Sequence, residues 1–104
     1  MANNGKKEIS IEDFIKQFDQ LWKADESETY SQMYELCILK IHTMNKHVLG
    51  RLGRLYRDGK GIEKNLNEAA RLMQLSLGGP VSWAEREYVD ILLSMDTPQS
   101  LVEA

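Results

Sequence analysis

The chain has 104 residues, of which 42% are hydrophobic, and carries a formal net charge of -3. This length suits one domain with one continuous core. The acidic balance, with a pI near 5.4, argues against a general nucleic-acid binder, because neutralisation of phosphate charge dominates such affinity. No apolar run of membrane-spanning length and no signal peptide are present. We therefore expect a cytoplasmic protein without membrane insertion.

The first half of the chain predicts two helices. Residues 1–8 are polar and are expected to form a disordered lead. Ser10 followed by Asp13 is a capping signature for a first helix that runs to about Ala24. After a break at 25–28, a second helix is expected over about 29–43, with an apolar face broad enough to pack on two sides. Cys37 lies in this apolar run, cannot form an internal disulfide, and is typical of a small buried side chain.

The segment 52–62 predicts the end of a third helix and a glycine turn. Gly53 lies within an apolar helical face, where it costs roughly 1 kcal/mol relative to alanine, so we expect a neighbouring helix to approach closely there. Gly59 and Gly61 follow the last periodic residue, where a chain leaving a helix commonly takes a left-handed conformation. Asn65 is placed to cap the next helix, with Glu68 three residues on as its capping-box partner.

Two further helices are expected in the second half. A fourth helix should span about 66–77 and end at the two glycines that follow. Pro80 or Ser82 should open a fifth helix, which stops near Asp96 and leaves 97–104 as a C-terminal tail. The fifth helix has no partner helix of its own, so its outer face, including Val89 and Leu93, could be a cap, a homodimer surface, or the place where a longer chain was cut.

This pattern resembles the Sel-one-like repeat, a helix-turn-helix relative of the tetratricopeptide repeat. Six positions match the family pattern in fixed register: Leu52, Gly53, Tyr56, Gly59, Gly61 and Ala69. Ile62 stands for the usual valine and Asn65 for the usual aspartate, while Glu68 and Leu72 replace residues that are often lysine and aromatic. The resemblance covers about one repeat, 45–79, and implies helices that stack in succession.

Internal repetition extends this interpretation to the rest of the chain. The apolar positions of the fourth helix recur 36 residues earlier, those of the third recur 34 residues earlier, and those of the third recur again 36 residues later. The alternative is that any two amphipathic helices can be overlaid at some offset. We predict an all-α, right-handed α-solenoid of about five antiparallel helices, two and a half units over about 10–44, 45–79 and 80–96.

No pattern in the sequence indicates catalysis or a cofactor. The Gly-Lys-Gly turn at 59–61 lacks both a preceding strand and phosphate-loop spacing. His42 and His47 lie five residues apart with Cys37 nearby, but a zinc site would also require a fourth ligand. The carboxylate pairs are better explained as helix caps and turn residues. We therefore expect a protein that is not an enzyme and has no metal or cofactor.

Basic charge is concentrated around the third helix. Residues 46–64 carry a net charge of +4, which leaves -7 for the remainder. Arg51, Arg54 and Arg57 are spaced to lie along one side of that helix, opposite much of its apolar face. This side is either a solvated surface or a site for the carboxylates of an acidic peptide or neighbouring domain. Trp83 lies off the main apolar stripe of the fifth helix, and either anchors a partner or packs under the preceding loop.

The leading functional hypothesis is a non-catalytic module for protein–protein interaction or oligomerisation, because the family that the chain resembles generally assembles complexes. The end of the chain, from Leu92 to Ser100, is similar to repeat tails of bacterial surface-polysaccharide synthesis proteins, which would make it an accessory region of a glycosyltransferase-like enzyme. The alternative is a binder of nucleic acid or another anionic ligand through Arg51, Arg54 and Arg57, although the acidic composition makes nucleic acid an unlikely partner.

Overall fold

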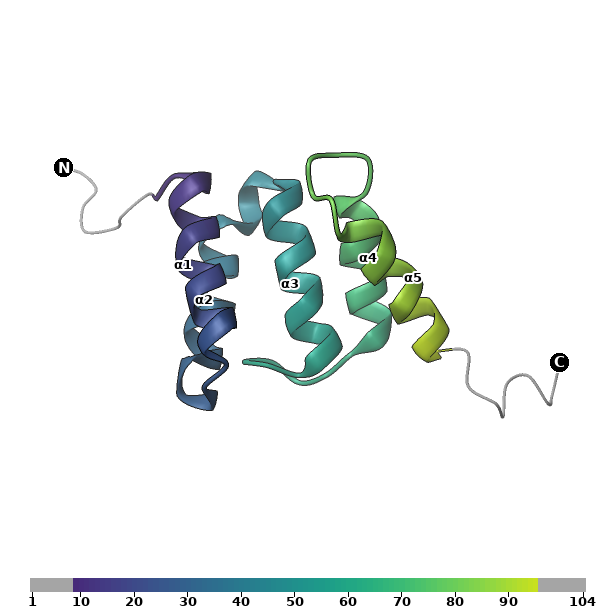
Figure 1. Cartoon of the computed structure of the whole chain (residues 1–104), viewed down its shortest axis with the longest axis horizontal. Coiled ribbons are helices and arrows are strands. Elements are labelled where there is room, and N and C mark those ends of the chain that lie inside the picture. Colours follow the sequence, from purple (N-terminus) through teal and green to yellow (C-terminus); the bar gives the residue numbers. More distant parts are fainter. Residues whose placement is uncertain (1–8, 96–104) are drawn as a thin grey trace, which may run out of the picture.

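The computed structural model describes residues 9–95, which form α-helices and short 3-10 turns without a strand (Figure 1). The helices are α1 (Ile11–Ala24), α2 (Tyr30–Lys40), α3 (Lys46–Asp58), α4 (Leu66–Ser76) and α5 (Ala84–Met95). Two 3-10 turns, η1 (Ser27–Thr29) and η2 (Ile41–Thr43), flank α2. The all-helical class predicted from the sequence is confirmed. The predicted lead at 1–8 and tail at 97–104 lie outside the described residues.

Helix boundaries follow the predicted caps with two differences. The side chain of Ser10 accepts a hydrogen bond from the backbone N–H of Asp13, and that of Asn65 accepts one from Glu68. The predicted capping box is wrong in its second half, because the Glu68 carboxylate pairs with Arg71 and the backbone N–H of Asn65 donates to Tyr56. The second helix was expected to run to residue 43, but its α-helical part ends at Lys40 and a 3-10 turn follows, in which the Thr43 hydroxyl donates to the Lys40 carbonyl at 2.7 Å. The fifth helix begins at Ala84, later than predicted.

Helix α3 lies between α1 and α2 on one side and α4 and α5 on the other (Figure 1). One cluster of buried side chains joins α1, α2 and α3, and also includes Leu72 of α4. A second cluster joins α4 and α5 around Ala69, Met73 and Ile91. Tyr56 of α3 packs against both clusters. Because α3 contributes to both sides, seven of its residues are buried: Val48, Leu49, Gly50, Arg51, Leu52, Gly53 and Leu55.

Close packing of α3 on α4 depends on Gly53. A Cβ at this position would lie 3.2 Å from Cε of Met73 and 3.3 Å from the backbone oxygen of Ala69. The second of these atoms belongs to the backbone and cannot turn away, so any larger side chain would push the two helices apart. The predicted close approach at Gly53 is therefore confirmed.

The connection from α3 to α4 reaches back to the turn between α1 and α2 (Figure 1). Gly59 and Gly61 have φ values of 69° and 79°, which confirms their predicted left-handed conformation. A Cβ at Gly61 would overlap the backbone oxygen of Tyr30. Nζ of Lys60 pairs with the Asp25 carboxylate at 2.9 Å, and this hydrogen bond is the main reason why the pKa of Asp25 lies below its ordinary value.

Candidate functional site

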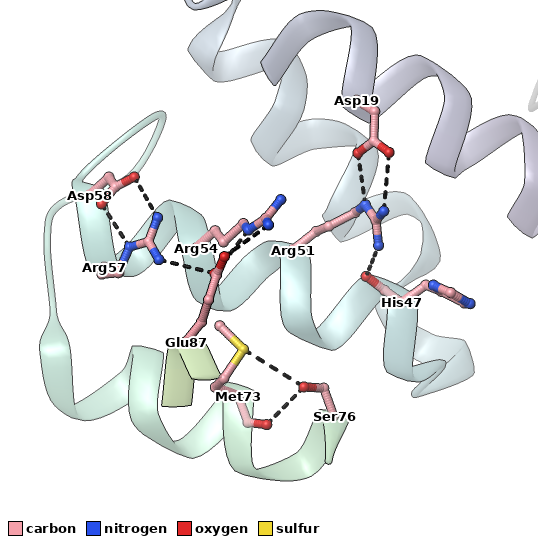
Figure 2. A network of polar contacts seen from close by, with 9 residues as sticks. All are labelled: Asp19, His47, Arg51, Arg54, Arg57, Asp58, Met73, Ser76 and Glu87. Carbon is pink, nitrogen blue, oxygen red and sulfur yellow. Dashed lines mark hydrogen bonds and ion pairs between the residues drawn. The ribbon is translucent and has the colours of Figure 1, made fainter. Parts of the chain in front are cut away.

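Figure 2 shows the predicted arginine row, whose polar contacts fall into one group around Arg51 and another around Glu87. Arg51 points from α3 toward α1, where its Nε and Nη2 atoms donate to the two carboxylate oxygens of Asp19 at 3.1 and 3.2 Å. Its Nη1 atom donates to the backbone oxygen of His47 at 3.3 Å. Arg51 is only 5% exposed. This guanidinium is therefore held by a bidentate ion pair between two helices.

Arg54 and Arg57 share one carboxylate from α5. Arg54 forms a bidentate pair with Glu87, with nitrogen–oxygen distances of 3.0 and 2.9 Å. Nη1 of Arg57 donates to the same Glu87 carboxylate at 3.0 Å (Figure 2). Arg57 also pairs with Asp58 next to it, and this hydrogen bond is the main reason why the pKa of Arg57 is raised. Glu87 thus joins α5 to α3.

Two tryptophan rings lie beside Arg54, and one of them also lies beside Arg51. The guanidinium carbon of Arg54 lies 3.7 Å from the centre of the Trp83 ring and 5.0 Å from that of Trp22. The Trp83 ring also lies beside Gly50, where an added Cβ would come within 3.0 Å of it. Such cation–π contacts contribute most where the charge is shielded from water. Because its ring contacts Arg54 and lies beside Gly50, Trp83 packs against α3.

The sequence analysis placed the arginine row opposite the apolar face of its helix. That placement is wrong for Arg51, because α1 packs against the side of α3 on which it lies. The partner-binding role predicted for Arg51, Arg54, Arg57 and Trp83 stays a prediction. The carboxylates that such a role requires are already supplied by Asp19 and by Glu87. A partner would have to displace them, at the cost of separating three partly buried ion pairs.

Sequence reasoning did not single out Asp19 and Glu87. Glu87 lies three residues after Ala84 and four before Ile91, both buried, so helical spacing puts it on the inner face of α5. An acidic residue on an inner face needs a cation nearby, which is the signal that could have identified Glu87. Asp19 gave no such signal, because its side chain is 46% exposed.

The residues of the predicted repeat signature have structural positions. Leu52, Gly53 and Ala69 are buried between helices. Tyr56 is half-buried between the two clusters, and burial is the main reason why its pKa is raised. These residues, together with the two glycines of the following turn, position α4 against α3.

The other candidate residues show no convergent chemistry. Over residues 9–95, His, Cys, Asp and Glu side chains form no group able to hold a metal ion. Cys37 is fully buried, and burial raises its pKa well above the ordinary value. Burial, and secondarily Arg51, lowers the pKa of His47, so this imidazole is neutral near pH 7. In the same part of the chain, no helix is long and apolar enough to cross a membrane.

The outer face of α5 exposes three large apolar side chains. Val89, Leu92 and Leu93 are 51%, 39% and 65% exposed. Their spacing of three and four residues places them on one side of the helix. A second exposed group, Ile38, Leu39 and Met44, lies at the end of α2 and in the turn after it. We call Val89, Leu92 and Leu93 the α5 stripe.

Searches for related proteins give no match to a family model, to a curated protein or to a solved structure. The resemblance to the Sel-one-like repeat therefore rests on the residues given above and stays a prediction.

Proposed function

We propose that this chain is a non-catalytic protein–protein interaction module, built as a short solenoid of two and a half antiparallel helix-turn-helix units, and that it binds a helix on the α5 stripe. In this arrangement α1 and α2 form the first unit, and α3 and α4 form the second. Helix α5 is the first helix of a third unit, and no second helix follows it within residues 9–95. Each unit of a solenoid stacks on its neighbours, so an end unit has an uncovered face.

Burial at corresponding positions supports the third unit. Val48 of α3 and Ala84 of α5 are 36 residues apart and are 0% and 1% exposed. Leu55 and Ile91 have the same separation, and both are fully buried. A shared spacing of buried positions is what equivalent helices of successive units would have.

One observation carries the proposal. At the same separation, Val89 and Leu92 correspond to Gly53 and Tyr56, which are the α3 residues that lie against α4 or its cluster. In α3 these positions are covered by the second helix of the unit, whereas in α5 they are exposed. Val89 and Leu92 therefore have the position of a helix-packing surface without its helix, and Leu93, which corresponds to Arg57, lies at the edge of that surface. Exposed apolar side chains grouped in this way are typical of interaction sites.

The alternative function, binding of nucleic acid or another anionic ligand, has less support. Each of Arg51, Arg54 and Arg57 already pairs with a carboxylate of this chain. The role as an accessory region in bacterial polysaccharide synthesis remains a sequence-based prediction.

The proposal can be tested by affinity capture from a lysate of the source organism with three baits. These are the unchanged chain, Leu93→Glu, and Leu39→Glu as a matched control on α2, where Leu39 is 39% exposed. We expect a protein, identified by mass spectrometry, that the unchanged chain and the control retain and Leu93→Glu loses. Identical captured sets for all three baits, with all three folded by circular dichroism, would contradict binding through α5.

A further inference from the structure

We propose that His47 is an acid-sensitive switch in the packing of α1 against α3, and that a proton on its imidazole weakens the ion pair through which Arg51 holds the two helices together. His47 is the second residue of α3, and its backbone N–H donates to the Asn45 side chain at 2.8 Å. Its backbone oxygen accepts from Nη1 of Arg51, the guanidinium that pairs with Asp19 of α1. His47 therefore lies both at the beginning of α3 and beside the ion pair between α1 and α3.

The Nδ1 atom of His47 has no place for a second proton. This atom is buried and has no hydrogen-bond partner among residues 9–95. In the neutral ring the proton can stay on Nε2, which leaves only a lone pair at Nδ1, but an imidazolium must donate from both nitrogens. Protonation would therefore create a buried donor without an acceptor, and an unpaired donor costs most when it carries charge.

The charges around the ring also oppose protonation. Burial disfavours the imidazolium most, and the Arg51 guanidinium acts in the same direction. The Asp19 carboxylate acts in the opposite direction as the smallest of the three causes, so the pKa of His47 lies below its ordinary value. Both oxygens of Asp19 are already bound by Arg51. The partial positive charge at the beginning of α3 further disfavours a cation there.

The ionisable groups that α2 and the first turn of α3 bring to this region do not offset the charge. Nζ of Lys46 donates to the Leu75 carbonyl of α4 at 2.8 Å. The Cys37 thiol of α2 also interacts with the Arg51 guanidinium, but it stays uncharged because burial raises its pKa. An imidazolium at His47 would therefore compete with Arg51 for the Asp19 carboxylate.

The direction of the pKa shift determines the pH dependence. Because the folded chain binds this proton less readily than the unfolded chain, the free energy of unfolding should fall as the pH drops below the ordinary histidine pKa of 6.5. The carboxyl groups of Asp25 and Glu68, whose pKa values are lowered, have ordinary values of 3.8 and 4.5. Their contributions to stability are lost only at lower pH, so a loss between about pH 7.5 and about pH 5.5 reports on histidine.

Urea unfolding of three chains at these two pH values tests the switch. The chains are the unchanged protein, His47→Gln, and His42→Gln as a matched control at the other histidine, which is exposed. We expect the urea midpoint of the unchanged chain and of His42→Gln to be lower at the acidic pH, and that of His47→Gln to be nearly the same at both. If His47→Gln keeps the full decrease, or His42→Gln loses it, the inference is wrong.

An NMR titration of the unchanged chain locates the effect without a substitution at His47. The two imidazole signals are assigned by the loss of one of them in His42→Gln. We expect the His47 ring to titrate below pH 6.5, and backbone amide shifts with the same midpoint to appear in α1 around Asp19 as well as in the first turn of α3. A His47 ring that titrates at pH 6.5 or above, or an α1 whose shifts do not follow it, would overturn the switch.

Discussion

The two complete helix pairs of this protein pack in opposite ways. Between α1 and α2, bulky buried side chains fill the space: Phe14, Phe18 and Met33 are all fully buried, and the two phenylalanine rings lie 5.8 Å apart. Between α3 and α4, Gly53 allows the backbones to approach, with Ala69 directly opposite. The first pair therefore depends on large buried side chains, and the second depends in addition on a glycine at the point where its two helices approach most closely.

This difference implies that opposite substitutions should disrupt the two pairs. Between α1 and α2, removing a large side chain should leave a cavity. Between α3 and α4, adding a side chain at the glycine should force the helices apart. The predictions below use this contrast, and start with the largest expected effect.

We expect Phe18→Ala to be the most damaging change. Phe18 is fully buried. Its ring contacts that of Phe14 and stacks on that of Trp22, with 6.0 Å between the ring centres, and the guanidinium carbon of Arg51 lies 5.9 Å from its centre. Truncation of such a buried aromatic side chain typically costs about 3–5 kcal/mol. Urea unfolding should show this loss in the midpoint. A loss below about 1 kcal/mol would mean that α1 and α2 can collapse around the cavity.

We expect Gly53→Leu to lower the free energy of unfolding by about 1–3 kcal/mol through overpacking. For a domain of this size, that loss lowers the melting temperature by several degrees, at roughly 4–8 °C per kcal/mol. Asn67→Leu, at an exposed position of α4, is the matched control and should leave the melting temperature nearly unchanged. Equal melting temperatures for Gly53→Leu and the control would show that α3 and α4 do not approach closely at Gly53.

Glu87→Gln should have a smaller effect, of about 1–2 kcal/mol, because it removes the charge that two arginines share while keeping the side-chain shape. The side chains of Glu87 and Arg54 are 13% and 14% exposed, so water replaces the lost interaction poorly. Asp58→Asn is the comparison, since Arg57 keeps its contact with Glu87 and an exposed pair contributes little. Thermal melts of both variants at low salt measure the difference. A larger loss for Asp58→Asn would contradict the bridging role of Glu87.

The smallest expected effect concerns Asp25, which follows α1 and pairs with Lys60 in the connection from α3 to α4. Its folded-state pKa is lowered by Lys60 and Tyr30 from an ordinary value of 3.8. A lowered carboxyl pKa stabilises the fold above that ordinary value, and this contribution disappears as the pH falls through the folded-state pKa. Asp25→Asn should therefore melt slightly below the unchanged chain at about pH 5, and the gap should close by about pH 2. A gap that widens on acidification would contradict this assignment.

The sequence predicted the helices well because their signals are local. Ser10 and Asn65 were recognisable as caps, and Gly59 and Gly61 as left-handed residues, from their neighbours in the chain alone. The environment of Arg51 could not be predicted in this way. The spacing of the arginine row suggested either a solvated surface or a site for carboxylates of a partner, but the burial of Arg51 depends on Asp19, a residue 32 positions earlier, and on the packing of α1 beside α3. The outer face of α5 was predicted from the sequence, because the residues after this helix were expected to form a tail and not a helix.

The central claim is that this protein binds a partner through the outer face of α5, and an NMR titration of the ¹⁵N-labelled chain with the protein captured from the lysate tests it most directly. We predict that the backbone amide shifts which the captured protein causes gather at Val89, Leu92 and Leu93 and at their neighbours on α5. They should be absent from α2, including the exposed Ile38 and Leu39. Shifts that gather on α2 instead would contradict association of this chain through α5, and so would a spectrum that the captured protein does not change.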